Sequence, residues 1–261
     1  DRGFKCGNPQ CYKKFSVKVG TIFENSKIPL RIWFAAIYLC TSHKKGVSSL
    51  QLGRDLNIPQ KTAWFLGQRI REMLKDKQPT MLSNAVEVDE TFIGGKDKNR
   101  HNHKKKGTIG RGTQEDKIVV LGLVERDGKV VATQIPDTKA QTIVPLIEKH
   151  VKKGSTMLTD EWYAYGQLHL KGYEHKSVQH NLKIYVVGDT HTNTIENFWS
   201  VLKRGLYGIY HYTSKKHIDR YLAEFSARYN TRDLTEEQRF DHFLAQSNVR
   251  LKYDTLVANP V

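Results

Sequence analysis

Long hydrophobic runs and cysteines are both scarce in this sequence. The longest apolar run, from Ile32 to Cys40, is nine residues long, whereas a membrane-spanning helix needs about 20. The chain has only three cysteines, which is too few for a disulfide framework. Its first residues are polar and do not resemble a secretion signal. We therefore expect a cytoplasmic protein that has no membrane partner.

Acidic residues are also in short supply. The 261 residues include 27 Asp and Glu against 42 Lys and Arg, which gives a net charge of +15. Such a charge attracts polyanions, so nucleic acid is the expected partner. A soluble basic protein without a specific partner is the alternative, because charge alone defines no contact. The chain is long enough to bury a substantial core.

A short N-terminal segment, residues 1–20, carries two of the cysteines. Cys6 and Cys11 flank a Gly/Pro turn in "CGNPQC", and a strand-like "YKKFSV" follows. Thiolates at this spacing suit one half of a tetrahedral zinc site. Two ordinary free cysteines are the alternative.

Residues 21–78 are expected to form a small helical domain. "PLRIWFAAIYLC", from Pro29 to Cys40, predicts a buried helix. "GVSSLQLGRDLNIPQKTAWFLGQRIREML", from Gly46 to Leu74, predicts two helices around the turn "NIP", with Thr62 opening the second. This pattern favours a helix-turn-helix, and a plain helical hairpin is the alternative. In a helix-turn-helix, the residues expected to contact DNA are Gln60, Lys61, Thr62 and Arg69.

From residue 79 to 261 the hydrophobic pattern changes to strands alternating with helices. "VEVDETFIGG" reads as a strand, and "KIVVLGLVERDGKVVATQIP" as two strands joined at Asp127 and Gly128. "KAQTIVPLIEKHV" predicts a helix, "STMLTD" a short buried strand and "TNTIENFWSVLKRGL" a second helix. The expected fold class is α/β, a mixed sheet with flanking helices. Residues 94–117 are expected to form a basic loop in which Lys104, Lys105 and Lys106 hold phosphates.

Two acids in this region stand at positions that predict a metal site. Asp89 lies in the first strand and Asp160 ends the later one, and in this order of elements the two strands can be neighbours. Two carboxylates brought together need a cation between them. Mg²⁺ prefers carboxylate and phosphate oxygens, which suits a phosphate-seeking protein.

The helix predicted after Asp160 offers the remaining groups of the metal site. Asn193, Glu196 and Asn197 share one helical face, and Lys203 lies two turns beyond Glu196. Glu196 is the expected third ligand and Asn193 the alternative, while Lys203 can reach a phosphate. Each acid could instead cap a turn or form a surface ion pair.

Several segments resemble a known family. "VEVDETFIGG", "LTDEWYAYG" and "HTNTIENFWSVLKRGLYGIYHYTSKKHIDRYLAEFSARYN" are similar to the catalytic segments of small bacterial insertion-sequence transposases, the ISXO-like group related to Merlin elements. "CYKKFSVKVGTIFENSKIPLRIWFAAIYL" is similar to that group's zinc ribbon and following helices. The resemblance implies an RNase H-like core with Asp89 and Asp160 as the first two metal ligands. The family's ribbon has two Cys pairs, so Cys6 and Cys11 make only a partial one.

The implied activity is metal-dependent cleavage and transfer of DNA strands. Two Mg²⁺ or Mn²⁺ ions would activate water and stabilise the leaving 3′ oxygen at a transposon end. The expected partners are double-stranded transposon ends and target DNA, and holding two ends together implies a homodimer. In a bacterial cell the protein would be associated with the nucleoid when bound to DNA. An inactive DNA-binding regulator and an RNase H-like nuclease are the alternatives.

Further residues are expected at the DNA surface. Arg204 follows Lys203 on the last catalytic helix, and "GLYGIYHYTSKKHIDRYL" interleaves Tyr207, Tyr210 and Tyr212 with basic residues. These tyrosines could stack on unpaired bases or pack against the sheet. Trp162 and Tyr163, directly after Asp160, could wall the active site or belong to the core.

Overall fold

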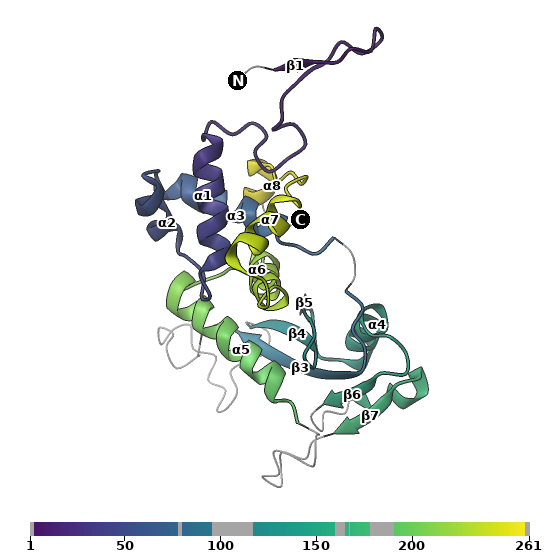
Figure 1. Cartoon of the computed structure of the whole chain (residues 1–261). Helices are drawn as coiled ribbons and strands as arrows, with labels where there is room; N and C mark the ends of the chain where they lie inside the picture. Colours follow the sequence, from purple (N-terminus) through teal and green to yellow (C-terminus); the bar gives the residue numbers. More distant parts are fainter. Residues whose placement is uncertain are drawn as a thin grey trace. The chain divides into compact units, whose positions relative to one another are not determined.

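The structure is a computed structural model that describes residues 3–77, 80–95, 117–159, 165–166, 168–177 and 191–258 (Figure 1). The chain forms two compact units. Unit 1 comprises Asp1–Lys75 and Thr231–Val261, and unit 2 comprises Asp76–Asn230. The predicted catalytic range 79–261 is therefore too long at its C-terminal end, because the last segment packs with the N-terminal helices. None of the helices in the described ranges is long and apolar enough to cross a bilayer.

Unit 1 is helical apart from a small hairpin. Its hairpin pairs two antiparallel strands, and its helices come from both ends of the chain. The elements are β1 (Phe4–Lys5), β2 (Lys14–Phe15), α1 (Leu30–Ser42), α2 (Ser49–Leu56), α3 (Gln60–Met73), α7 (Glu236–Leu244) and α8 (Tyr253–Val257). Helices α1 and α7 pack together although they lie far apart in the sequence.

The connection between α2 and α3 is tight. Ser48 caps α2 by accepting a hydrogen bond from the backbone N–H of Gln51 (3.1 Å), and Asn57 ends the helix in the left-handed conformation with φ 51°. A Cβ on Gly53 would lie 2.9 Å from the carbonyl oxygen of Ile58, so only glycine lets the turn pass this close. The two helices and their short turn lie where the sequence predicts them, and this arrangement is common to a helix-turn-helix and to a plain helical hairpin. Helix α3 begins at Gln60, slightly before the predicted start.

Unit 2 is built on a five-stranded mixed sheet. Its strands are β3 (Ala85–Ile93), β4 (Ile118–Glu125), β5 (Val130–Ile135), β6 (Thr156–Thr159) and β7 (Glu174–Ser177). The strand order is β5-β4-β3-β6-β7. Strand β3 is central, antiparallel to β4 and parallel to β6, so the predicted neighbours do lie side by side. The β4–β5 hairpin turns at Asp127, whose φ is 56°, as the Asp-Gly signal indicates.

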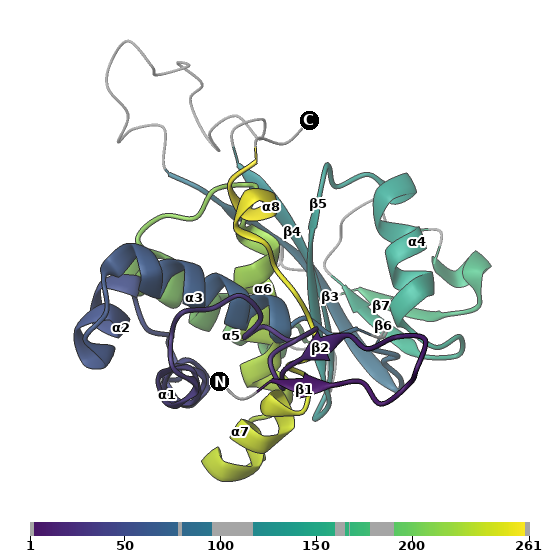
Figure 2. The same cartoon turned by 90° about the horizontal axis from the view of Figure 1, so that it is seen from above.

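Helices cover both faces of this sheet (Figure 2). Helix α4 (Ala140–His150) packs on one face through a cluster that includes Val86, Val88 and Ile143. Helices α5 (Asn193–Gly205) and α6 (Ile218–Asn230) pack on the other through a cluster that includes Val120 and Trp199. A 3-10 turn (Leu168–Lys171) precedes β7, and a π-helical turn (Leu206–Tyr210) follows α5. The predicted mixed sheet with flanking helices is confirmed.

Candidate active site

The central strand β3 carries acidic residues on one face. Successive side chains of a strand alternate between the two faces of a sheet. Glu87 and Thr91 pair in register with Val124 and Val120 of β4, and both valines belong to the cluster formed with α5 and α6. Asp89, which lies between Glu87 and Thr91, therefore faces α5. The candidate site is this line of residues and the helix above it.

Asp89 is held by the indole of α5. Its Oδ2 accepts a hydrogen bond from Trp199 Nε1 (2.9 Å). The indole fits because Asp89 pairs across the sheet with Gly122, where a Cβ would lie 2.4 Å from the Trp199 ring and 2.8 Å from Ile195. The missing side chain on β4 thus makes the space that lets Trp199 reach the carboxylate.

Lys203 lies near the same carboxylate. It is half-buried, and this burial lowers the pKa of its ammonium group, while the charge of Asp89 acts in the opposite direction. Glu196, Trp199 and Lys203 stand at i, i+3 and i+7 on α5, so they form one stripe along the helix. Asp89 contacts the middle of this stripe.

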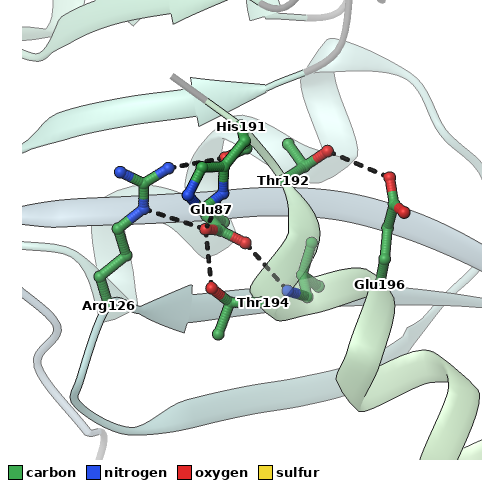
Figure 3. Close-up of polar contacts among 7 residues, drawn as sticks. Glu87, Arg126, His191, Thr192, Thr194 and Glu196 are labelled. Carbon is green, nitrogen blue, oxygen red and sulfur yellow. Dashed lines mark hydrogen bonds and ion pairs between the residues drawn. The ribbon is translucent and has the colours of Figure 1, made fainter. Parts of the chain in front are cut away.

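Glu196 and Asn193 lie at the start of α5 and are exposed. Glu196 Oε1 accepts a hydrogen bond from Thr192 Oγ1 (3.3 Å) (Figure 3). Arg204, at the other end of the helix, is exposed and its Nε donates to the carbonyl oxygen of Ser200 (3.2 Å). The two candidates for the third ligand are thus one turn apart on the same exposed edge.

Asp160 lies outside the described residues. Strand β6 ends at Thr159, and its register with β3 pairs Glu87 with Leu158. Among the residues that the structure describes, no three His, Cys, Asp or Glu side chains gather into a metal site. The described part of the site is therefore Asp89, Trp199, Lys203 and Glu196. Trp162 and Tyr163 are also outside the described residues.

Glu87, which is not among the residues selected from the sequence, lies on the same face of β3 as Asp89. It is fully buried, and Figure 3 shows its carboxylate between Arg126, His191 and the first turn of α5. The signal was present in "VEVDE", where Glu87 and Asp89 have the spacing of residues on one strand face. Two acids on the same face of a strand that lies in a sheet predict that both have partners.

The helix-turn-helix residues divide into two groups. Gln60 and Lys61 are exposed and Thr62 is half-buried at the start of α3. Arg69 is only 4% exposed, and its Nη2 donates to the carbonyl oxygen of Glu24 (2.8 Å). Its guanidinium also lies 5.5 Å from the ring centre of Trp33. The expectation that Arg69 contacts DNA is therefore withdrawn, because its guanidinium serves the core of unit 1.

The three tyrosines beyond α5 have different environments. Tyr207 is exposed, and its hydroxyl accepts from the N–H of Gly94 (3.2 Å). Tyr210 packs on Tyr221, with ring centres 4.8 Å apart, and belongs to the core. Tyr212 is 80% exposed, the most of the three. Lys104, Lys105 and Lys106 lie outside the described residues.

Cys6 and Cys11 flank the turn of the β1–β2 hairpin as free thiols. Backbone hydrogen bonds hold this turn together. The N–H of Cys6 donates to the carbonyl oxygen of Lys13 (2.9 Å), and the N–H of Cys11 donates to the carbonyl oxygen of Asn8 (3.0 Å). Two thiols are half of a tetrahedral zinc site, and no third ligand of the described chain joins them.

The fold and site define a mixed α/β core in which the central strand carries Asp89 beneath helix α5. Residues 81–230 match the model of the ISXO2-like transposase domain. The chain belongs to this family, which confirms the resemblance seen in the sequence.

Two curated relatives agree with this assignment. The chain is 33% identical over 228 residues to an uncharacterized protein in transposable element ISH50 of Halobacterium salinarum, covering 84% of this chain and 76% of the relative. It is 28% identical over 109 residues to an uncharacterized transposase-like protein of Haemophilus influenzae, covering 42% of this chain and 87% of the relative. The Mos1 strand transfer complex is similar at a TM-score of 0.25 and 14% identity, over 88% of this chain and 82% of the Mos1 chain. A score this low adds nothing to the assignment.

Proposed function

We propose that this transposase binds the terminal inverted repeats of an insertion sequence and cleaves and joins DNA strands with a divalent metal at Asp89. The observation that carries the proposal is the placement of Asp89. Its carboxylate faces α5 from the central strand and is oriented by Trp199. A half-buried carboxylate with a fixed orientation at the middle of a sheet suits the role of a metal ligand.

The second acid of the proposed site is Asp160. It directly follows β6 in the sequence. Glu87 and Leu158 are register partners in parallel strands, and each stands two residues before one of the two acids. We include Asp160 because the same register, continued, would make the acids neighbours.

The donor chemistry fits Mg²⁺ or Mn²⁺. Asp89, Asp160 and Glu196 offer carboxylate oxygens, which these ions prefer, and Asn193 offers an amide oxygen as the alternative third ligand. A pair of bound ions supplies an activated water and stabilises the leaving oxygen. The two thiols Cys6 and Cys11 do not enter the proposal, which makes no use of zinc.

The protein groups around the ions would place the DNA. Lys203 presents a cation beside Asp89, where a scissile phosphate would need its charge balanced. Trp199 keeps the Asp89 carboxylate from rotating. These roles require geometry more than proton transfer, because the acids would act as ligands.

DNA recognition would be separate from cleavage. Gln60, Lys61 and Thr62 at the exposed start of α3 would read bases in the major groove. Lys104, Lys105, Lys106 and Arg204 would contact phosphates, so affinity should fall steeply with salt. Tyr212 would stack on an unpaired base. Two bound ends would require a homodimer, acting in the bacterial cytoplasm on the nucleoid.

The proposal is tested by removing one acid. Asp160→Ala is expected to abolish Mg²⁺-dependent nicking of labelled duplexes that end in the inverted repeats, while binding of those duplexes stays close to wild type. The matched control is Lys61→Ala, which should weaken binding to the ends and leave the metal site intact.

Three results would speak against parts of the proposal. Cleavage of any duplex without preference would indicate a general nuclease, and cleavage of the RNA strand of a hybrid an RNase H-like enzyme. Specific binding with no cleavage by the wild-type chain in Mg²⁺ or Mn²⁺ would indicate a DNA-binding regulator.

A further inference from the structure

Glu87 is a charged side chain with no exposed surface. A buried carboxylate is costly unless donors surround it. Its Oε1 accepts from Arg126 Nε (3.0 Å) and Thr194 Oγ1 (2.9 Å), and its Oε2 accepts from the backbone N–H of Ile195 (2.9 Å) (Figure 3). One side chain therefore joins the central strand, the β4–β5 turn and the first turn of α5.

Arg126 extends this junction on both sides. Its Nη2 donates to the carbonyl oxygen of His191 (2.8 Å), and its backbone N–H donates to the carbonyl oxygen of Ala85 (3.0 Å). His191 Nδ1 also lies 3.5 Å from Glu87 Oε1. His191, two residues before α5, is thus held to the sheet by Arg126, and the helix itself is held by Glu87.

The start of α5 depends on Glu87 for its cap. The first N–H groups of a helix have no partner within the helix, and a negative charge next to them is favourable. Thr192 is the N-cap residue, but its side chain makes no capping hydrogen bond. Glu87 takes that place from another element by binding the N–H of Ile195.

We propose that Glu87 is a positioning residue for the metal site of the proposed function. It lies two residues before Asp89 on the same strand face, which is about 7 Å along the strand. The backbone amide that it binds belongs to the residue next to Glu196. Glu87 therefore sets the position of Glu196 relative to Asp89 through one strand segment and one hydrogen bond.

A purely structural role makes a different prediction. If Glu87 only stabilised unit 2, its loss would lower the melting temperature without changing metal affinity in the folded protein. If it positions the ligands, loss of its charge would weaken metal binding in protein that is still folded. Metal affinity measured without DNA separates the two roles.

The experiment is an electron paramagnetic resonance titration of the full chain with Mn²⁺, together with thermal melting. Glu87→Gln keeps the shape and one acceptor for Ile195, but it removes the charge that binds Arg126. We expect the Mn²⁺ dissociation constant to rise about 10- to 100-fold, as when groups that orient metal ligands are removed. Cleavage should recover as Mn²⁺ is raised, with binding to DNA ends unchanged.

Two further variants make the test decisive. Val88→Ala, on the opposite face of β3, is the control, because it should lower the melting temperature and leave Mn²⁺ affinity as in the wild type. Thr194→Val removes a single donor to Glu87 and keeps the shape. It should raise the Mn²⁺ dissociation constant by a smaller factor, and it serves as the test if Glu87→Gln does not fold.

The two failures are distinguishable. Wild-type protein that binds Mn²⁺ and cleaves DNA, beside Glu87→Gln protein with the same Mn²⁺ affinity, would overturn the positioning role alone. If Glu87→Gln does not fold, Thr194→Val protein with the Mn²⁺ affinity of the wild type would overturn the positioning role instead. A wild-type chain that neither binds Mn²⁺ nor cleaves DNA would overturn the proposed function, and the positioning role with it.

Discussion

The first half of strand β3 carries different residues on its two faces. On the face toward α4, Val86 and Val88 are fully buried in an apolar cluster, and Glu90, further along that face, accepts a hydrogen bond from the Tyr165 hydroxyl (2.5 Å). On the face toward α5, the strand presents Glu87, Asp89 and Thr91. Both faces are covered by helices, so burial does not explain the difference. The helices themselves must differ in what they offer the strand.

Helix α5 brings partners for polar groups, whereas α4 brings aliphatic side chains. Ile195 and Trp199 of α5 donate hydrogen bonds to Glu87 and Asp89. The described residues of α4 contribute Ile143, Val144 and Ile147 to the opposite cluster. One sheet can thus be stabilised on one face and equipped for chemistry on the other, and the predictions below test this division.

The largest effect on DNA cleavage is expected from replacing Asp89 on the face toward α5, and a replacement of Val88 on the opposite face is the comparison. Asp89→Asn should lower the rate of DNA cleavage by more than about 100-fold, because loss of a ligand should exceed the loss of a group that orients one. The fold should be kept, as shown by an unchanged circular dichroism spectrum. Val88→Ala should instead lower the free energy of unfolding by about 2 kcal/mol, with cleavage at low temperature retained. Equal losses of activity in both variants would contradict the division.

A methyl group at Gly122 should disturb the α5 face from the neighbouring strand. Gly122→Ala would place its Cβ 2.4 Å from the Trp199 ring, and such overpacking costs about 1 to 3 kcal/mol. We expect a lower midpoint in urea unfolding together with slower cleavage. Gly208→Ala is the control, since a Cβ there meets nothing within 4 Å. A Gly122→Ala protein with wild-type stability and activity would show that the indole does not need this space.

Removing only the hydrogen bond to Asp89 should have a moderate effect. Trp199→Phe keeps an aromatic ring on the sheet but loses the N–H that donates to Oδ2. A hydrogen bond to a charged group contributes roughly 1.5 kcal/mol or more, so single-turnover cleavage should slow about 10-fold. Phe198→Leu, which changes packing on the same helix without contacting Asp89 in any described interaction, should affect stability more than cleavage.

The smallest effect is a loss of folding stability at low pH, to which histidines beside both faces of the sheet should contribute. Burial lowers the pKa of His150, at the end of α4, and of His217, just before α6. The unfolded chain then takes up protons at a higher pH than the folded one, so stability falls as the pH drops below the ordinary histidine value of about 6.5. Melting temperatures between pH 7.5 and 5 should decline less in His150→Gln than in the wild type. A parallel decline would assign the loss to other groups.

Local patterns predicted much of unit 2. The alternation in "VEVDETFIGG", the Asp-Gly turn and the apolar spacing of the two long helices correspond to β3, the β4–β5 hairpin, α4 and α5. Asp89 was correctly placed on a strand, because the alternating pattern around it is local. These features depend on neighbours within a few residues, which the sequence displays directly.

Long-range packing was the part that local patterns missed. A cation such as Arg69 in a helix suggests a surface residue, yet the rings of Trp33 and Phe65 lie beside its guanidinium in the fold. The segment Thr231–Val261 joined the N-terminal helices because α7 packs on α1. Neither the contact of Arg69 with these rings nor that of α7 with α1 is indicated by neighbouring residues in the sequence.

The sequence by itself determined the family, many of the strands and helices of unit 2, and the position of Asp89 on a strand, because periodicity and short motifs are local properties. Only the tertiary structure decided which partners the acids receive. Trp199 reaches Asp89 through the space left by Gly122, and Glu87 caps a helix more than 100 residues further along the chain. A buried charge selects its partners in three dimensions, since the cost of its desolvation is offset only by donors that the folded chain brings to it.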